Sequence, residues 1–78
     1  MSNVEKLAKV FADTFGIRVE ETVGLVYQGI EAWDSVGHMT LVAAIEDNFD
    51  IMLDTDDIID MSSFEKAQEI LKKYNVEF

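Results

Sequence analysis

The chain has 78 residues, no cysteine and a formal net charge of −10, from 16 acidic and 6 basic residues. Without cysteine it has no disulfide, no thiolate metal site and no cysteine nucleophile. The negative charge disfavours nucleic acid and anionic lipid as partners and favours proteins with basic surfaces. A charge that serves only solubility is the alternative.

A chain of this length forms one domain, spanning residues 1–78, and its 49% of hydrophobic residues supports a small folded core. No apolar run is long enough to span a membrane, and no charged-then-apolar signal opens the chain. We therefore expect a cytoplasmic protein without membrane insertion. The first residue is Met1, which favours a complete gene product, and we expect a monomer.

The first helix is expected from Ser2 to Phe15, because apolar residues recur there at helical spacing along one side. Ser2 and Glu5 have the spacing of a capping box, and Gly16 is a suitable stop. These signals predict an amphipathic helix whose apolar stripe belongs to the core.

Residues 17–33 show no clean period and form a connection that is long for so small a domain. Packing onto the core is expected from its apolar residues, which are Val19, Val23, Leu25, Val26 and Ile30. Trp33 is expected to close the connection onto the core. The length of the connection leaves open whether the helices on either side run parallel or antiparallel.

The second helix, from Ser35 to about Asn48, is the element around which the chain is organised. Its main apolar stripe recurs every four residues and consists of Leu41, Ile45 and Phe49, widened by Val42. A second, shorter apolar face consists of Val36, Met39 and Ala43. Two apolar faces beside a cluster of acids predict the core on one side and a partner on the other. The alternative is that Met39 belongs to the edge of the core.

A polar connection follows, with a short helix expected at residues 56–60 and with Leu53, Ile58 and Met61 as its apolar anchors. The density of aspartates in this segment invites comparison with a calcium-binding loop. Ile59, however, stands where the sharp turn of such a loop needs glycine. We therefore expect no calcium-binding loop of this type and no metal site, with weak binding of cations at the surface as the alternative.

The last helix is expected from Ser63 to Tyr74, and Ser62 and Glu65 have the spacing of a capping box. The chain shows no strand-like alternation of useful length. The pattern therefore predicts an all-α four-helix bundle, with three main amphipathic helices, one short helix and a long first loop.

Asp34 and Ser35 stand at the start of the second helix. Both residue types are good N-terminal caps, and capping alone is the simplest interpretation of the pair. A serine hydroxyl at a helix start also lies near unpaired N–H groups, which is a favourable environment for a phosphate. The pair by itself does not distinguish these two interpretations.

Over nearly its whole length the chain resembles acyl carrier proteins. The resemblance rests first on Asp34-Ser35-Val36 at the start of the second helix. Matching residues continue to the last helix, and they are Leu41, Ile45, Glu46, Asp47, Phe49, Leu53, Ile58 and Ser62-Ser63-Phe64. Chain length, helix order and acidity agree with this resemblance.

The resemblance implies a carrier and not an enzyme. A phosphopantetheinyl transferase would transfer phosphopantetheine from coenzyme A to the hydroxyl of Ser35, with Asp34 in a supporting role. The thiol of this arm would hold an acyl group as a thioester. The resemblance also implies partner enzymes that load and transfer acyl groups, in fatty-acid, polyketide or other specialised acyl biosynthesis.

The partner enzymes are expected to dock through basic surfaces. We expect their docking surface on the second helix, formed by Val36, Met39, Glu46 and Asp47, with Asp34 at its edge. The alternative function is that of an unmodified acidic helical adaptor for a basic protein partner.

Several residues depart from the pattern of the fatty-acid members of the family. Gly37 stands where these members usually carry an acidic residue, Thr40 stands where Glu is common, and the chain has no proline. These departures favour a specialised stand-alone carrier. His38 is the only histidine, and with no triad or metal set around it we expect it to face solvent near the arm.

The acids between Glu31 and Asp60 have no Lys or Arg among them. Folding brings these like charges together, so we expect neighbouring carboxylates to raise one another's pKa. Mild acidification and divalent cations are then expected to raise the stability of the fold.

Overall fold

The computed structural model describes residues 2–78 and forms them into four α-helices, with no strand among those residues. The helices are α1 (Asn3–Phe15), α2 (Ser35–Phe49), α3 (Thr55–Asp60) and α4 (Phe64–Lys72), and a 3-10 helix, η1 (Val19–Thr22), lies between α1 and α2. Met1 lies outside the described residues. The predicted all-α fold, with three main helices, one short helix and a long first connection, is confirmed.

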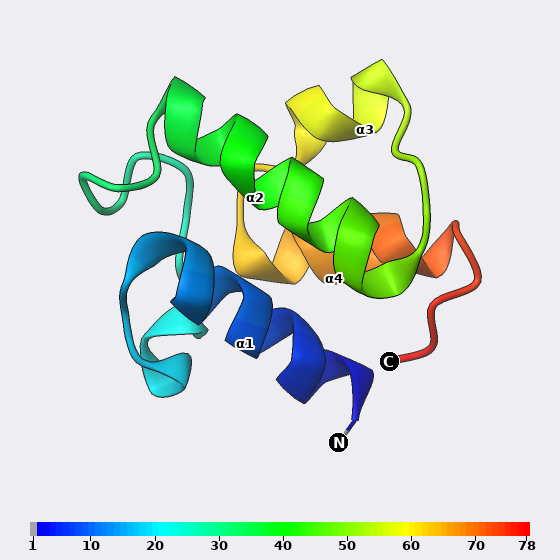
Figure 1. Cartoon of the computed structure of the whole chain (residues 1–78), viewed down its shortest axis with the longest axis horizontal. Coiled ribbons are helices and arrows are strands. Elements are labelled where there is room, and N and C mark those ends of the chain that lie inside the picture. The colour runs from blue at the N-terminus through cyan, green and yellow to red at the C-terminus, as the bar shows by residue number, and fades with distance from the viewer. Residues whose placement is uncertain (1) are drawn as a thin grey trace.

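Helices α1 and α2 lie against each other and run in opposite directions (Figure 1). This arrangement settles the orientation that the sequence left open. Helix α1 also contacts α4, and α3 lies on the side of α2 away from α1. Within residues 2–78, each helix is too short or too polar to cross a membrane.

Aromatic rings from α1, the long connection and α4 form the centre of the core. Phe11 is fully buried and packs edge-to-face against Trp33 and Phe64, with ring centroids 5.4 and 5.1 Å away. Trp33 is also fully buried and stacks on Phe15 at 5.4 Å. The expected role of Trp33 in closing the connection onto the core is confirmed. Helix α2 contributes its predicted stripe to the same core through Leu41, Val42 and Ile45.

The long connection is anchored by fewer side chains than its apolar residues predict. Leu25 and Thr22 are buried, but Val19, Val23 and Val26 are 45%, 78% and 49% exposed. The expectation that these three valines pack onto the core was wrong. Backbone hydrogen bonds to another part of the chain hold this segment together with the side chains of Leu25, Ile30 and Trp33, which pack on the core.

Those hydrogen bonds attach the connection to the junction between α3 and α4. The N–H of Tyr27 donates to the carbonyl of Ser62 at 2.8 Å, and the N–H of Phe64 donates to the carbonyl of Leu25 at 2.9 Å. An isolated antiparallel bridge lies between these two bonds. The pairing fixes the place of Tyr27 in the fold.

The ends of α1 follow the predicted signals. Ser2 and Glu5 form a capping box in which each side chain accepts a hydrogen bond from the backbone of the other residue. Gly16 ends the helix in the left-handed region at φ 69°, and its N–H donates to the carbonyl of Ala12. Glycine suits this position because a side chain would strain the left-handed backbone.

At α4 the predicted cap is displaced by one residue. Ser63, and not Ser62, is the cap, because the Oγ of Ser63 accepts the N–H of Lys66 at 2.9 Å. Glu65 therefore does not complete a capping box with Ser62. Its carboxylate instead accepts the N–H of Gly24 at 3.2 Å, a further tie between α4 and the long connection.

Candidate functional site

Ser35 is the first residue of α2, and it is exposed. Asp34 precedes it as the cap, and the Oδ1 of Asp34 accepts the N–H of Gly37 at 2.7 Å. The carbonyl of Asp34 accepts the N–H of His38 at 2.8 Å. Asp34 therefore performs the capping role that the sequence allowed to either residue, and the hydroxyl of Ser35 is not needed for it.

Gly37 allows the long connection to pass close to the first turn of α2. A Cβ at this position would lie 2.0 Å from the carbonyl oxygen of Ala32 and 3.3 Å from the Oδ1 of Asp34. The first distance is shorter than any real contact of a Cβ atom, so a side chain here would displace the backbone. Close packing thus accounts for a glycine that the resemblance did not predict.

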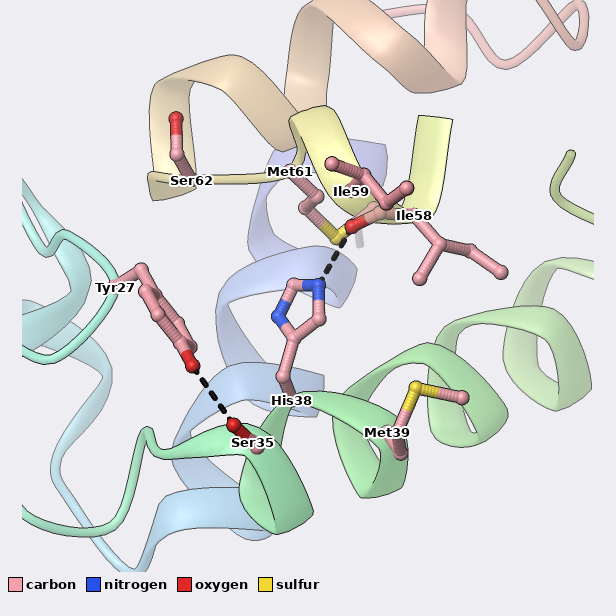
Figure 2. A pocket seen from close by; sticks show the side chains of 8 residues that line it. All are labelled: Tyr27, Ser35, His38, Met39, Ile58, Ile59, Met61 and Ser62. Atoms are coloured by element: carbon pink, nitrogen blue, oxygen red, sulfur yellow. Dashed lines mark hydrogen bonds between the residues drawn. The ribbon is translucent and has the colours of Figure 1, made fainter. Parts of the chain in front are cut away.

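Tyr27 reaches Ser35 from the long connection. Its hydroxyl oxygen lies 3.2 Å from the Oγ of Ser35, within hydrogen-bond distance (Figure 2). No sequence pattern pointed to Tyr27, because its place depends on the way the connection folds back onto the α3–α4 junction. The structure thus adds a polar neighbour to the predicted attachment residue.

His38 lies between three segments of the fold and is half-buried. Its Nδ1 accepts the indole N–H of Trp33 at 2.9 Å, and its Nε2 lies 2.7 Å from the carbonyl oxygen of Ile58. An indole nitrogen only donates and a carbonyl only accepts, so the neutral imidazole with its proton on Nε2 satisfies both bonds. The expectation that His38 faces solvent was wrong, because both of its nitrogens are engaged within the fold.

A cavity of about 360 Å³ opens beside Ser35. Its lining combines polar residues, Tyr27, Ser35, His38 and Ser62, with apolar residues, Met39, Ile58, Ile59 and Met61 (Figure 2). Both nitrogens of His38 are already bonded within the fold, so its imidazole offers the cavity no free donor or acceptor. The cavity therefore suits an apolar group that extends from the position of Ser35.

All four residues expected to bind partners lie on α2. Val36 and Met39 are 76% and 56% exposed, and Asp47 is exposed as well. Glu46 is half-buried, and its Oε2 accepts the N–H of Leu53 at 2.9 Å. Glu46 thus has a role within the fold, in holding the connection between α2 and α3, which the sequence did not indicate.

Asp57 on α3 is held from the side of α4. It is only 5% exposed, and its carboxylate accepts hydrogen bonds from the Nζ of Lys73 and from the hydroxyl of Tyr74, the latter at 2.5 Å. The bond from Lys73, followed by that from Tyr74, lowers the pKa of Asp57. The same bonds raise the pKa values of Lys73 and Tyr74. For Asp57 this shift is opposite to the raised pKa expected among crowded acids.

Within residues 2–78, no group of three or more His, Cys, Asp or Glu side chains is arranged to hold a metal ion. Comparisons with protein-family models, with curated proteins and with solved structures found no match. The site itself consists of an exposed hydroxyl at a helix start, a phenol beside it and an adjoining cavity.

Proposed function

We propose that the protein is an acyl carrier, with Ser35 as the attachment residue and phosphopantetheine from coenzyme A as the cofactor. One observation carries the proposal. The hydroxyl of Ser35 is exposed at the start of α2 and borders a largely apolar cavity, while Asp34 performs the capping role. A serine present only as a cap would use its own Oγ on the N–H groups of the helix. The resemblance to acyl carrier proteins supports the same residue.

The residues around Ser35 fit a phosphopantetheine group. A phosphate on Ser35 would lie at the positive end of the α2 dipole, beside the N–H groups of its first turn. When bound, the group would supply a thiol to which acyl groups attach as thioesters, and the chain has no cysteine of its own. The part of the chain is to present the serine oxygen and to shelter an apolar group beside Met39, Ile58 and Met61.

The exposed surface of α2 supports the docking part of the proposal. Val36 and Met39 offer apolar contacts, Asp34 precedes the helix, and Asp47 lies near its end. Residues 19–65 contain no Lys or Arg, so no positive charge in this segment opposes a basic partner. We propose that the transferase and the acyl-transferring enzymes dock here, with charge guiding the encounter and apolar contacts holding the complex.

Intact mass after incubation with coenzyme A and a broad-specificity phosphopantetheinyl transferase tests the attachment residue. The wild-type chain should gain the mass of one phosphopantetheine group, and Ser35→Ala should gain nothing. Ser62→Ala is the matched control, because it removes a hydroxyl from another residue that lines the same cavity, and it should load as the wild type does. A mass gain by Ser35→Ala would show that phosphopantetheine is attached to another residue. A wild-type chain that gains no mass would favour the unmodified acidic adaptor.

Two substitutions separate the structural role of Asp34 from its proposed role in modification. Asparagine caps helices about as well as aspartate, so Asp34→Asn should change the free energy of unfolding by less than about 0.5 kcal/mol. Asp34→Ala removes both the carboxylate and the cap, and it should lower the free energy of unfolding by about 1 kcal/mol. If the carboxylate helps the transferase to orient Ser35 and metal-bound coenzyme A, as the resemblance implies, both variants should load more slowly than the wild type. Equal loading rates for Asp34→Asn and the wild type would remove this role.

A further inference from the structure

Tyr27 is the side chain that forms a hydrogen bond with the hydroxyl of Ser35, at 3.2 Å. It belongs to the long connection and not to α2, so it meets Ser35 from a separate part of the fold. Neither capping nor the packing of α2 requires this contact. Its place beside the proposed attachment atom therefore raises the question of what the phenol does there.

The fold holds the ring of Tyr27 independently of Ser35. The ring lies edge-on to the rings of Trp33 and His38, and its centroid is 6.1 Å from that of Trp33 and 5.6 Å from that of His38. Trp33 is fully buried, and His38 is bonded through both nitrogens, so both neighbours are fixed. The backbone of Tyr27 is also bonded to Ser62. The hydroxyl of Tyr27 is therefore delivered to a defined place and does not need Ser35 to hold it.

The chemistry of the two hydroxyl groups favours one direction for their bond, although the oxygen positions allow either. A phenol is a stronger acid than an alkyl alcohol and is therefore the better donor, which favours donation from Tyr27 to the Oγ of Ser35. The proton of Ser35 then remains available to another acceptor. The opposite direction could not persist after modification, because an esterified serine oxygen carries no hydrogen.

We infer that Tyr27 is a positioning residue for the modification of Ser35 and for the phosphodiester that results, an inference that rests on the proposed carrier function. In the loading step, the Oγ of Ser35 forms a bond to phosphorus of coenzyme A, and its proton passes to a base of the transferase. The bond from that phosphorus to the oxygen of adenosine 3′,5′-bisphosphate breaks, and this nucleotide leaves. Before the step, Tyr27 donates to this serine oxygen. After the step, it donates to the same oxygen or to an oxygen of the attached phosphate.

The position of Tyr27 also favours one orientation of the attached group. Tyr27 and Ser35 line the cavity together with Met39, Ile58 and Met61 (Figure 2). A phosphodiester that is bonded to Tyr27 is restrained beside this cavity. Loss of the phenol hydroxyl should therefore make the attached group more mobile and more exposed to solvent.

Tyr27→Phe tests the inference because it removes the hydroxyl oxygen and retains the ring. In the loaded protein, this variant should shift the ³¹P resonance of the phosphodiester and narrow its line, because the phosphate loses a hydrogen bond and moves more freely. Loaded Ser62→Ala, the matched control from the same cavity, should keep the wild-type resonance. In loading kinetics, Tyr27→Phe should lower kcat by about two- to tenfold, the factor that corresponds to one neutral hydrogen bond. The KM for coenzyme A should stay unchanged, because the transferase binds that substrate.

A measurement on the wild-type chain does not depend on how the variant folds. The chain has two tyrosines, and the hydroxyl of Tyr74 is bonded to Asp57. With ¹³C at the Cζ atoms of tyrosine, loading should move the Tyr27 resonance and leave that of Tyr74 in place.

Identical ³¹P resonances in loaded wild type and loaded Tyr27→Phe would overturn the inference and leave the carrier function intact. If Tyr27→Phe does not fold, a Tyr27 carbon resonance that stays in place on loading would overturn it in the same way. A wild-type chain that accepts no phosphopantetheine would overturn the carrier function and this inference together.

Discussion

The short helix α3 is attached to the rest of the fold from two sides by two adjacent residues. On the side of α4, the carboxylate of Asp57 accepts hydrogen bonds from Lys73 and Tyr74. On the side of α2, the carbonyl of Ile58 accepts a hydrogen bond from His38. With 6 residues, α3 is too short to be stable through its own helical hydrogen bonds. Its position therefore depends on both attachments, and the two use different chemistry.

The attachment to α4 is charged, and the attachment to α2 is neutral. The Lys73 side chain is 61% exposed, so its ion pair with Asp57 responds to pH and to salt. The bond to Ile58 continues through the half-buried His38 to the buried indole of Trp33, and His38 and Ile58 both line the cavity. We infer that the α2 attachment sets the shape of the site, whereas the α4 attachment adds stability that solution conditions can change.

Loss of the imidazole should have the strongest effect on stability. His38→Phe keeps a ring at this position but leaves the buried N–H of Trp33 without an acceptor and the carbonyl of Ile58 without its donor. We expect the free energy of unfolding to fall by about 2–4 kcal/mol, from two lost bonds and one buried unsatisfied donor. Urea denaturation at neutral pH measures this loss.

A double-mutant cycle with Trp33→Phe tests the reason for this loss. Once His38→Phe has removed the acceptor, Trp33→Phe removes the unsatisfied donor and should therefore destabilise less than it does in the wild type. Strictly additive losses would contradict the hydrogen bond between Trp33 and His38 as the basis of the α2 attachment.

Gly37→Ala examines the same side of the molecule at the first turn of α2. Helix propensity alone predicts a gain of about 1 kcal/mol, because alanine is the better helix former. A Cβ placed 2.0 Å from the carbonyl oxygen of Ala32 instead forces the connection away from the helix. We expect a net loss of about 1–3 kcal/mol in the free energy of unfolding, as for an overpacked core. A gain in stability would show that the connection does not pass against this turn.

Asp57→Asn tests the α4 attachment and should have the weakest effect on stability at neutral pH. The Lys73 side chain is exposed, and an ion pair with an exposed lysine contributes little to the free energy of unfolding. Asp56→Asn is the matched control, since it removes the same charge from an exposed neighbour on α3. Asp57→Asn should have the lower melting temperature of the two. Equal melting temperatures would mean that the bonds to Lys73 and Tyr74 do not stabilise the fold.

The pH dependence of this attachment follows from the directions of the pKa shifts. The pKa of Asp57 is lowered from 3.8, so its contribution is complete above that value and is lost as the pH falls through the folded-state pKa. The pKa values of Lys73 and Tyr74 are raised from 10.5 and 10.0. The stability that these two groups contribute is therefore complete below 10.0 and is lost as the pH rises through their folded-state pKa values. The stability difference between the wild type and Asp57→Asn should therefore narrow at both extremes of pH. A difference that stays constant in acid would contradict this assignment.

Features that depend on local pattern could be predicted from the sequence. The apolar spacing located the main helices, and the signals at Ser2 and Gly16 located both ends of α1. The position of Ser35 at a helix start and the packing of Trp33 onto the core were predicted as well. Each of these features is set by neighbours within a few residues or by the size and polarity of a single side chain.

Features that depend on the course of the long connection could not be predicted in this way. Tyr27 meets Ser35 because the connection pairs with a distant segment, and such pairing leaves no periodic signal in the sequence. From the sequence, Gly37 was only a departure from the family pattern, and its reason became visible with the path of the connection past it. The polar partners of His38 and Asp57 likewise come from elements that only the folded chain brings near them.

The pairing between the connection and the α3–α4 junction has a consequence for the order in which the domain folds. The N–H groups of Tyr27 and Phe64 are bonded across segments far apart in the chain, so these bonds form only after a large loop has closed, at a cost in entropy. Helix α2 gains most of its hydrogen bonds from within itself. We expect the amide hydrogens of Tyr27 and Phe64 to become protected from exchange later in refolding than those of α2. A newly made chain would then contain the helix that carries Ser35 before the surroundings of Ser35 are complete.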